Sequence, residues 1–175
     1  PFYNGEYFQD FEFIQSLELG FDNSVALRQG DIELELEIKE DFITAPFSGS
    51  GEVTGELIFA GYGIASDKLE YNDFANVDVK EKIVIIMRHN PEHDSAMSAF
   101  DRYSALRVKA SAARDSGAAA IIFVNGFEPL EEDELIEFKY DRGPQMAMPI
   151  VHVKRTLVND ILTNAGYNFK EIQDR

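Results

Sequence analysis

Hydrophobic and charged residues alternate strictly near the N-terminus of the chain. One face of the alternation carries Ile32, Leu34, Leu36 and Ile38, and the other carries Glu33, Glu35, Glu37 and Lys39. A period of two predicts a strand with one buried and one solvent-facing side, so we interpret the Glu row as a solvated face. Val25 and Leu27 precede this strand across a Gly-containing turn at residues 28–31, which predicts a β-hairpin.

Shorter segments flank this hairpin. Residues 7–19 are rich in aromatic side chains and are interpreted as a strand, and residues 46–55 are rich in Gly and Ser and predict a loop. Residues 57–60 predict a further strand that stops at the Gly-Tyr-Gly turn of residues 61–63. The polar residues 66–76 predict a loop.

Unbroken hydrophobic runs appear farther along the chain. Residues 83–87 and 119–124 are typical of strands that are buried on both faces. Between them, residues 101–116 have a helical spacing of apolar side chains, and Gly117 is the expected C-terminal cap. Strand, helix and strand in this order predict a βαβ unit with two parallel strands and a right-handed connection.

The last part of the chain predicts a loop, a strand and a helix. Residues 128–148 contain an acidic run from Glu131 to Glu134 and predict a long loop. Residues 150–153 predict a short strand. Thr156 is the expected N-cap of a final helix that ends at Gly166.

Composition narrows the range of functions. The chain has 175 residues, is 45% hydrophobic and carries a formal net charge of −16, so it can form a core but repels nucleic acid and anionic membrane surfaces. No stretch approaches the roughly 18 apolar residues of a membrane span. Cys is absent, which excludes disulfides and thiolate chemistry. Because the chain starts at Pro1 without a signal peptide, we expect an internal fragment.

A short motif suggests a zinc site, but its context does not. His89-Asn90-Pro91-Glu92-His93 matches the H-x-x-E-H pattern of one class of zinc peptidases, in which a helix brings both His side chains to one face. Here a predicted strand ends at Met87, and Pro91 fits only the first turn of a helix, which would leave His89 outside it. We therefore interpret the segment as a polar loop and assign no metal ligand and no catalytic residue.

Other candidate sites are also better explained as structure. His152 lies in a predicted strand and is expected to be half-buried and bonded to the backbone. The acidic run lacks the D-x-D-x-D-G pattern of a calcium-binding loop, so a solvated loop is favoured. No G-x-S-x-G sequence is present. The glycines have the wrong spacing for a dinucleotide-binding loop and are interpreted as turns: Gly49, Gly51, Gly55, Gly61 and Gly63.

Several segments, in order, resemble the protease-associated domain found in zinc aminopeptidases of the transferrin-receptor-like group. They are GELIFAGYGI at 55–64, YNDF at 71–74, VDVKEKIV at 77–84, YSALRVKA at 103–110, GAAAIIFV at 117–124 and MPIVHV at 148–153. Glu81 stands where Gly is usual in the family. The YFQDF sequence at residues 7–11 resembles the Y-x-Q-x-F that precedes the inserted domain.

This resemblance implies a protease-associated-domain fold of the α/β class, with a mixed β-sheet or β-sandwich, flanking helices and one βαβ unit. It implies lead-in strands and a hairpin over residues 1–50, the domain core over 51–155, and a C-terminal helix over 156–175 that leads to a peptidase domain. No His in the chain is followed by Asp two positions on, as in the family's first metal motif. The two zinc ions are therefore expected in the peptidase domain, with no cofactor in this chain.

The resemblance also implies a function. We expect a non-catalytic domain of a zinc-dependent aminopeptidase that shapes substrate access, with the peptidase domain and peptide substrate as partners, in the periplasm or outside the cell. The alternative is an independent interaction module of a sorting receptor or another protease class. Tyr62, Tyr103 and Arg107 are candidate cleft or interface contacts, because Tyr and Arg are common interface anchors. Packing of Tyr62 and Tyr103 in the core is an equal alternative.

Overall fold

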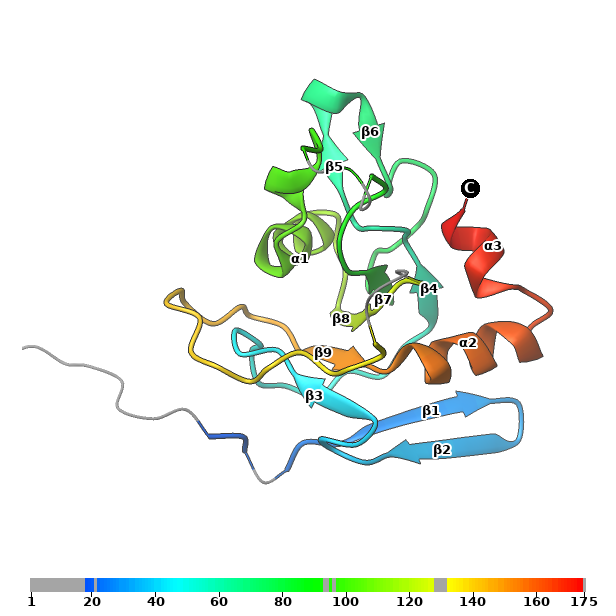
Figure 1. Cartoon of the computed structure of the whole chain (residues 1–175). Helices are drawn as coiled ribbons and strands as arrows, with labels where there is room; N and C mark the ends of the chain where they lie inside the picture. Colours follow the sequence, from blue (N-terminus) through cyan, green and yellow to red (C-terminus); the bar gives the residue numbers. More distant parts are fainter. Residues whose placement is uncertain (1–17, 21, 93–94, 96, 128–131, 175) are drawn as a thin grey trace, which may run out of the picture.

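The computed structural model describes residues 18–174 except 21, 93–94, 96 and 128–131, so most of the strand expected at residues 7–19 lies outside the described residues. At its centre is a five-stranded mixed sheet (Figure 1). The strand order is β3 (Phe42–Thr44), β9 (Ile150–Val153), β8 (Ala120–Val124), β7 (Ile83–Met87) and β4 (Leu57–Phe59). Strands β4, β7, β8 and β9 are parallel, and β3 pairs antiparallel to β9. The predicted mixed α/β fold is confirmed.

Two small antiparallel pairs accompany this sheet. The predicted hairpin is formed by β1 (Val25–Gln29) and β2 (Ile32–Leu36). The second pair, β5 (Ala65–Ser66) and β6 (Tyr71–Asn72), encloses the short 3-10 helix η1 (Asp67–Leu69), within a segment that was expected to be a loop. Leu34 lies on the hairpin face that was expected to be buried, yet it is 45% exposed. A two-stranded hairpin has too little facing surface to bury every apolar side chain.

Three α-helices of the described chain pack on the sheet. α1 (Leu106–Asp115) connects β7 to β8 and completes the predicted βαβ unit, preceded by the 3-10 helix η2 (Asp101–Tyr103). α2 (Arg155–Asn164) follows β9, and α3 (Phe169–Gln173), which the sequence analysis missed, follows α2. None of the described helices is both long and apolar enough to cross a membrane.

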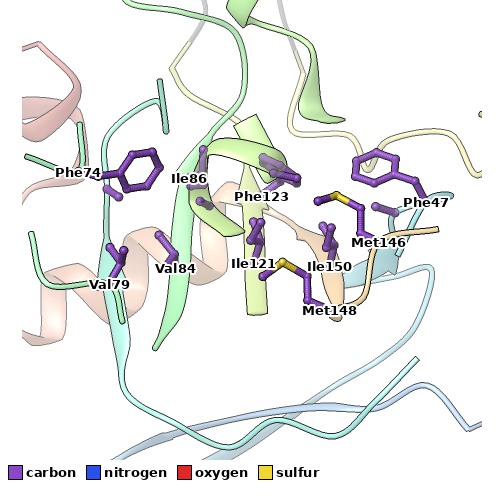
Figure 2. Packing of buried hydrophobic residues seen from close by; sticks show 14 residues of the cluster. Phe47, Phe74, Val79, Val84, Ile86, Ile121, Phe123, Met146, Met148 and Ile150 are labelled. Carbon is purple, nitrogen blue, oxygen red and sulfur yellow. The ribbon is translucent and has the colours of Figure 1, made fainter. Parts of the chain in front are cut away.

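Each central strand is buried on both faces, as its unbroken hydrophobic run predicts. Val84, Ile86, Ile121 and Phe123 point to one face, where they pack with α1 and with Met146 and Met148 (Figure 2). The intervening residues point to the opposite face and pack with Val158 of α2 and Phe169 of α3: Ile85, Met87, Ile122 and Val124. The sheet is therefore the middle of three layers, and the core lies on both of its sides.

The four parallel strands lie in the sheet in the same order as in the sequence. β4, β7, β8 and β9 follow one another in the chain and lie side by side in that same order. Open α/β sheets usually bind ligands where the strand order reverses, because the connections there run to opposite faces and leave a crevice. The parallel strands of the described chain have no such reversal, so the fold does not supply that crevice.

The start of α2 differs from the prediction. The N-cap position is Lys154, which makes no side-chain capping bond, and Thr156 lies inside the first turn. The expected Thr156 cap is therefore wrong, because a carboxylate from the distant Asp133 takes that role. The predicted division into residues 1–50, 51–155 and 156–175 stays a prediction.

Candidate functional site

Buried polar side chains gather at the carboxyl ends of the central strands. Asn125 follows β8, His152 lies in β9, and both are completely buried. Arg88 Nη1 donates to Asn125 Oδ1 over 2.7 Å, and His152 Nε2 lies 3.2 Å from the same oxygen. The backbone N–H of Ile136 donates to His152 Nδ1 over 3.3 Å. Since a backbone N–H can only donate, Nδ1 is unprotonated and the ring proton is on Nε2.

Burial keeps His152 neutral. Burial, together with the positive charge of Arg88, lowers the pKa of His152 to about 3, and the carboxylate of Asp133 opposes the shift. The expected bond to the backbone is confirmed, but the expected half-burial is wrong, because the ring is completely buried and both its nitrogens are bonded inside the protein. An imidazole with this pKa and with both nitrogens bonded inside the protein is not placed to act as a general base.

Asp133 lies beside this cluster and caps α2 from the acidic loop. Its carboxylate accepts from the backbone N–H groups of Arg155 over 2.8 Å and Thr156 over 3.1 Å. Asn125 Nδ2 donates to Asp133 Oδ1 over 3.3 Å and to the carbonyl of Glu134 over 2.8 Å. The negative charge is also favourable at the positive end of the helix dipole. The expectation of a freely solvated acidic loop is therefore wrong at Asp133, because α2 offers it unpaired N–H donors.

A second buried cluster surrounds Lys109 of α1, which is completely buried. Its Nζ donates to the carbonyl of Met87 over 2.8 Å and lies 5.3 Å from the centre of the Tyr62 ring. Burial lowers the pKa of Lys109 to about 7, and the nearby Asp73 opposes that shift. Burial also raises the pKa of Asp73, which accepts a hydrogen bond from the Tyr71 hydroxyl. An amine this deeply buried cannot reach a substrate, so we interpret Lys109 as the tether between α1 and β7.

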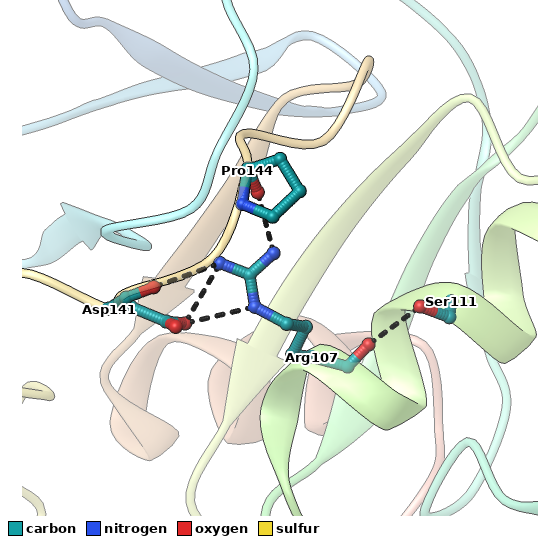
Figure 3. Close-up of polar contacts among 4 residues, drawn as sticks. All are labelled: Arg107, Ser111, Asp141 and Pro144. Carbon is teal, nitrogen blue, oxygen red and sulfur yellow. Dashed lines mark hydrogen bonds and ion pairs between the residues drawn. The ribbon is translucent and has the colours of Figure 1, made fainter. Parts of the chain in front are cut away.

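Arg107 of α1 clamps the loop that follows the acidic run (Figure 3). Its Nε and Nη2 lie 3.2 and 3.1 Å from Asp141 Oδ2, and its Nη1 donates to the carbonyl of Pro144 over 2.6 Å. The guanidinium also lies over the Phe47 ring, 4.7 Å from its centre. A Cβ on Gly143 would lie 2.7 Å from Arg107 Cζ, so a larger residue at this position would push the guanidinium out of its present place. The side chain thus holds residues 141–144 against the domain.

We expect Arg107→Lys to loosen this loop and lower the free energy of unfolding by about 1–2 kcal/mol, because an ammonium cannot form the forked contacts of a guanidinium. Amide hydrogen exchange at residues 140–143 should become faster, and urea unfolding gives the change in stability. The matched control is Arg114→Lys on the same helix, whose partner Asp115 forms an exposed pair that should contribute less than about 0.5 kcal/mol. Equal effects of the two changes would contradict the clamp.

The candidate contact residues from the sequence are all engaged within the domain. Tyr62 is 4% exposed and lies in the core, which matches the core-packing alternative. Tyr103 is half-buried, and its hydroxyl accepts a hydrogen bond from Ser66 Oγ over 2.7 Å. Arg107 is occupied by the clamp. The three side chains therefore make contacts within the domain itself.

The H-x-x-E-H segment forms turns, not a helix, where the structure describes it. His89, the second residue after β7, has a φ of 59°, and Pro91 and Glu92 lie in a turn, whereas His93 lies outside the described residues. Asn90 is buried and anchors the segment, since its Nδ2 donates to Ser104 Oγ over 2.8 Å. Among the described residues, no three His, Cys, Asp or Glu side chains converge as a metal site would require.

The hairpin and α2 also border a groove that was not predicted from the sequence. Its apolar lining comes from Leu27, Leu34, Leu57, Leu157 and Ile161, and its polar lining comes from Arg28, Asp160 and Asn164. No sequence motif marks this groove, because its walls come from three segments that are distant in the chain.

A protein-family model matches the chain. The family model for the PA domain matches residues 53–161, more than half of the chain. The structure is similar to an aminopeptidase from Aneurinibacillus sp. strain AM-1, with 22% sequence identity and a TM-score of 0.49. That similarity covers 76% of this chain and 26% of the aminopeptidase, so the chain spans about a quarter of that protein's length. A search of curated proteins found no match.

Proposed function

The chain belongs to the PA domain family, and from this premise we propose that it is a non-catalytic accessory domain of a zinc-dependent aminopeptidase. The family-like segments between residues 55 and 153 and the YFQDF sequence at residues 7–11 support the aminopeptidase assignment. The observation that carries the non-catalytic role is the burial of His152 and Lys109. Both side chains are completely buried and bonded within the domain, so neither can act on a bound peptide.

The proposed role is to shape access to the peptidase cleft. A rigid domain beside a cleft adds a wall that limits the length and sequence of substrates without altering the metal chemistry. The Arg107 clamp and the Lys109 tether support this role, because they fix surface loops and α1 to the sheet. The two zinc ions would be bound by the peptidase domain, and that domain and the peptide substrate would be the partners. We place the protein in the periplasm or outside the cell, on the family resemblance and the acidic composition.

Removal of the domain from the full-length enzyme tests this proposal. Because β3 pairs with β9 and the hairpin shares a core with α2, the excision should run from β1 to the end of α3, residues 25–173, with a short linker. We expect the ratio of kcat/KM between short and long peptides to change by about fivefold or more, which is the range that contacts of 1 kcal/mol or more produce. The zinc content should stay at two ions per chain.

The control is the full-length enzyme with Lys139→Gln, which removes one exposed ion pair and should leave the ratio unchanged. A folded deletion variant with full zinc content and an unchanged ratio would reduce the domain to a scaffold. A full-length protein with neither zinc nor aminopeptidase activity would favour the alternative, an interaction module of a sorting receptor or another protease class.

A further inference from the structure

Residues 125–127, which leave β8, are bonded to both C-terminal helices. The backbone N–H of Phe127 donates to Gln173 Oε1 of α3 over 2.6 Å, and the Phe127 ring packs edge-on against Phe169 with 5.5 Å between ring centres. Arg155 Nη1, at the start of α2, donates to the carbonyl of Gly126 over 2.5 Å. The Arg155 guanidinium also lies over the Phe127 ring, 4.8 Å from its centre. Arg155 thus binds the same short segment that contacts α3.

Residues 133–136 of the acidic loop are bonded to the same structure from the other side. Asp133 accepts from the backbone N–H of Arg155 and from Asn125 Nδ2. The carbonyl of Glu134 and the N–H of Ile136 are bonded to the buried side chains of Asn125 and His152. Arg155 therefore contacts both segments. Its backbone N–H binds the acidic loop, and its side chain binds residues 126–127, which contact α3.

The negative charge of the chain opposes the attachment of the acidic loop, so specific bonds must hold the loop in place. Glu131 to Glu134 carry four negative charges in a chain of net charge −16, and charges of one sign repel. Completely buried polar groups cost free energy unless they are bonded, and His152 and Asn125 are buried and bonded to this loop. α2 has no side-chain cap at Lys154, so the capping bonds come from Asp133. Two buried polar side chains and the start of α2 thus all form hydrogen bonds with the same loop.

We propose that Asp133 is a positioning residue that couples the acidic loop to both C-terminal helices, to α2 by capping and to α3 through the shared contacts of Arg155. The coupling is reciprocal, as any coupling between two sites must be. Docking of α3 therefore favours the attached loop, and displacement of the loop at Asp133 loosens α3. This coupling does not depend on the proposed function, since it concerns contacts within the described chain.

Asp133→Ala and Asp133→Asn test the coupling, with Glu132→Ala as the matched control at the neighbouring exposed acid. Hydrogen exchange of single amides is measured by NMR on the whole chain. Loss of the cap should speed exchange of the Arg155 and Thr156 amides about fivefold in Asp133→Ala and less in Asp133→Asn, which keeps one acceptor. The decisive measurement is exchange of the Phe127 amide, because this amide is not bonded to Asp133. If loss of the α2 cap also loosens the contacts with α3, the Phe127 amide should exchange at least about twofold faster.

The reciprocal variant is Gln173→Ala, which should speed exchange of the Thr156 amide even though these two residues share no hydrogen bond. Faster α2 amides with an unchanged Phe127 amide would overturn the proposal, because Asp133 would then be a local cap only. Glu132→Ala matching Asp133→Ala at every amide would overturn it as well, since loss of negative charge alone would then explain the result. Asp133→Asn keeps the test usable if Asp133→Ala does not fold.

Discussion

Alanine at position 49 is expected to lower the free energy of unfolding by about 3 kcal/mol or more, enough to reduce Tm by roughly 6–12 °C in a chain of this length. An added Cβ would overlap the carbonyl oxygen of Met146 and lie 2.8 Å from the backbone nitrogen of Met148. Both are main-chain atoms, and the two segments are joined by a bond from the Gly49 N–H to the Met148 carbonyl over 2.9 Å. The clash can be relieved only by breaking that pairing.

Gly55→Ala is the matched control from the same loop. The nearest atom to its added Cβ is the carbonyl oxygen of Glu81 at 3.6 Å, an ordinary contact. We expect a change of less than about 1 kcal/mol, because the site has room and its backbone is not left-handed. Urea unfolding of both variants supplies the comparison. Similar losses at the two positions would show that the close approach at Gly49 does not limit stability.

Both glycines lie in a segment whose irregular structure is predictable from its sequence but whose neighbours in space are not. The Gly- and Ser-rich composition of residues 46–55 correctly predicts an irregular segment, because that preference is local. It does not show that residues 45–49 run beside 146–150, about a hundred positions later. β3 was missed for a related reason: its three residues form a strand only because β9 lies beside them. The βαβ unit was predictable because its strands and helix each carry their own hydrophobic period.

The candidate site was less predictable than the fold. Arg107 was singled out from a family-like segment, but its partners Asp141 and Pro144 lie more than thirty positions away in a loop with no motif. Asn125 and Asp133 gave no signal, because polar residues after a strand or in an acidic run usually face solvent. Lys109 carried a usable signal, since it lies among the apolar helix positions of Leu106, Ala110 and Ala113. A charged residue within an apolar stripe predicts a buried, bonded amine.

His152 makes the stability of the chain depend on pH, because its pKa differs between the folded and the unfolded state. In the folded state its pKa is about 3, because burial and the positive charge of Arg88 lower it more than the carboxylate of Asp133 raises it. In the unfolded chain the pKa of His is about 6.5. Above pH 6.5 both states are neutral and His152 contributes no pH dependence. Between pH 6.5 and 3 only the unfolded state binds the proton, so stability falls as pH falls, and below pH 3 the contribution is constant.

Between pH 7 and pH 5, protonation of the unfolded His should therefore lower the free energy of unfolding by about 2 kcal/mol. The measurement is urea unfolding at both pH values for the wild type and for His152→Gln. The variant should lose this part of the pH dependence while keeping that of the other titrating groups, whatever its stability at pH 7. The ring nitrogens offer an independent check, because their NMR shifts should remain those of the neutral tautomer with the proton on Nε2 down to pH 5. A ring that titrates near pH 6, or equal pH dependence in both proteins, would mean that burial beside Arg88 does not hold the imidazole neutral.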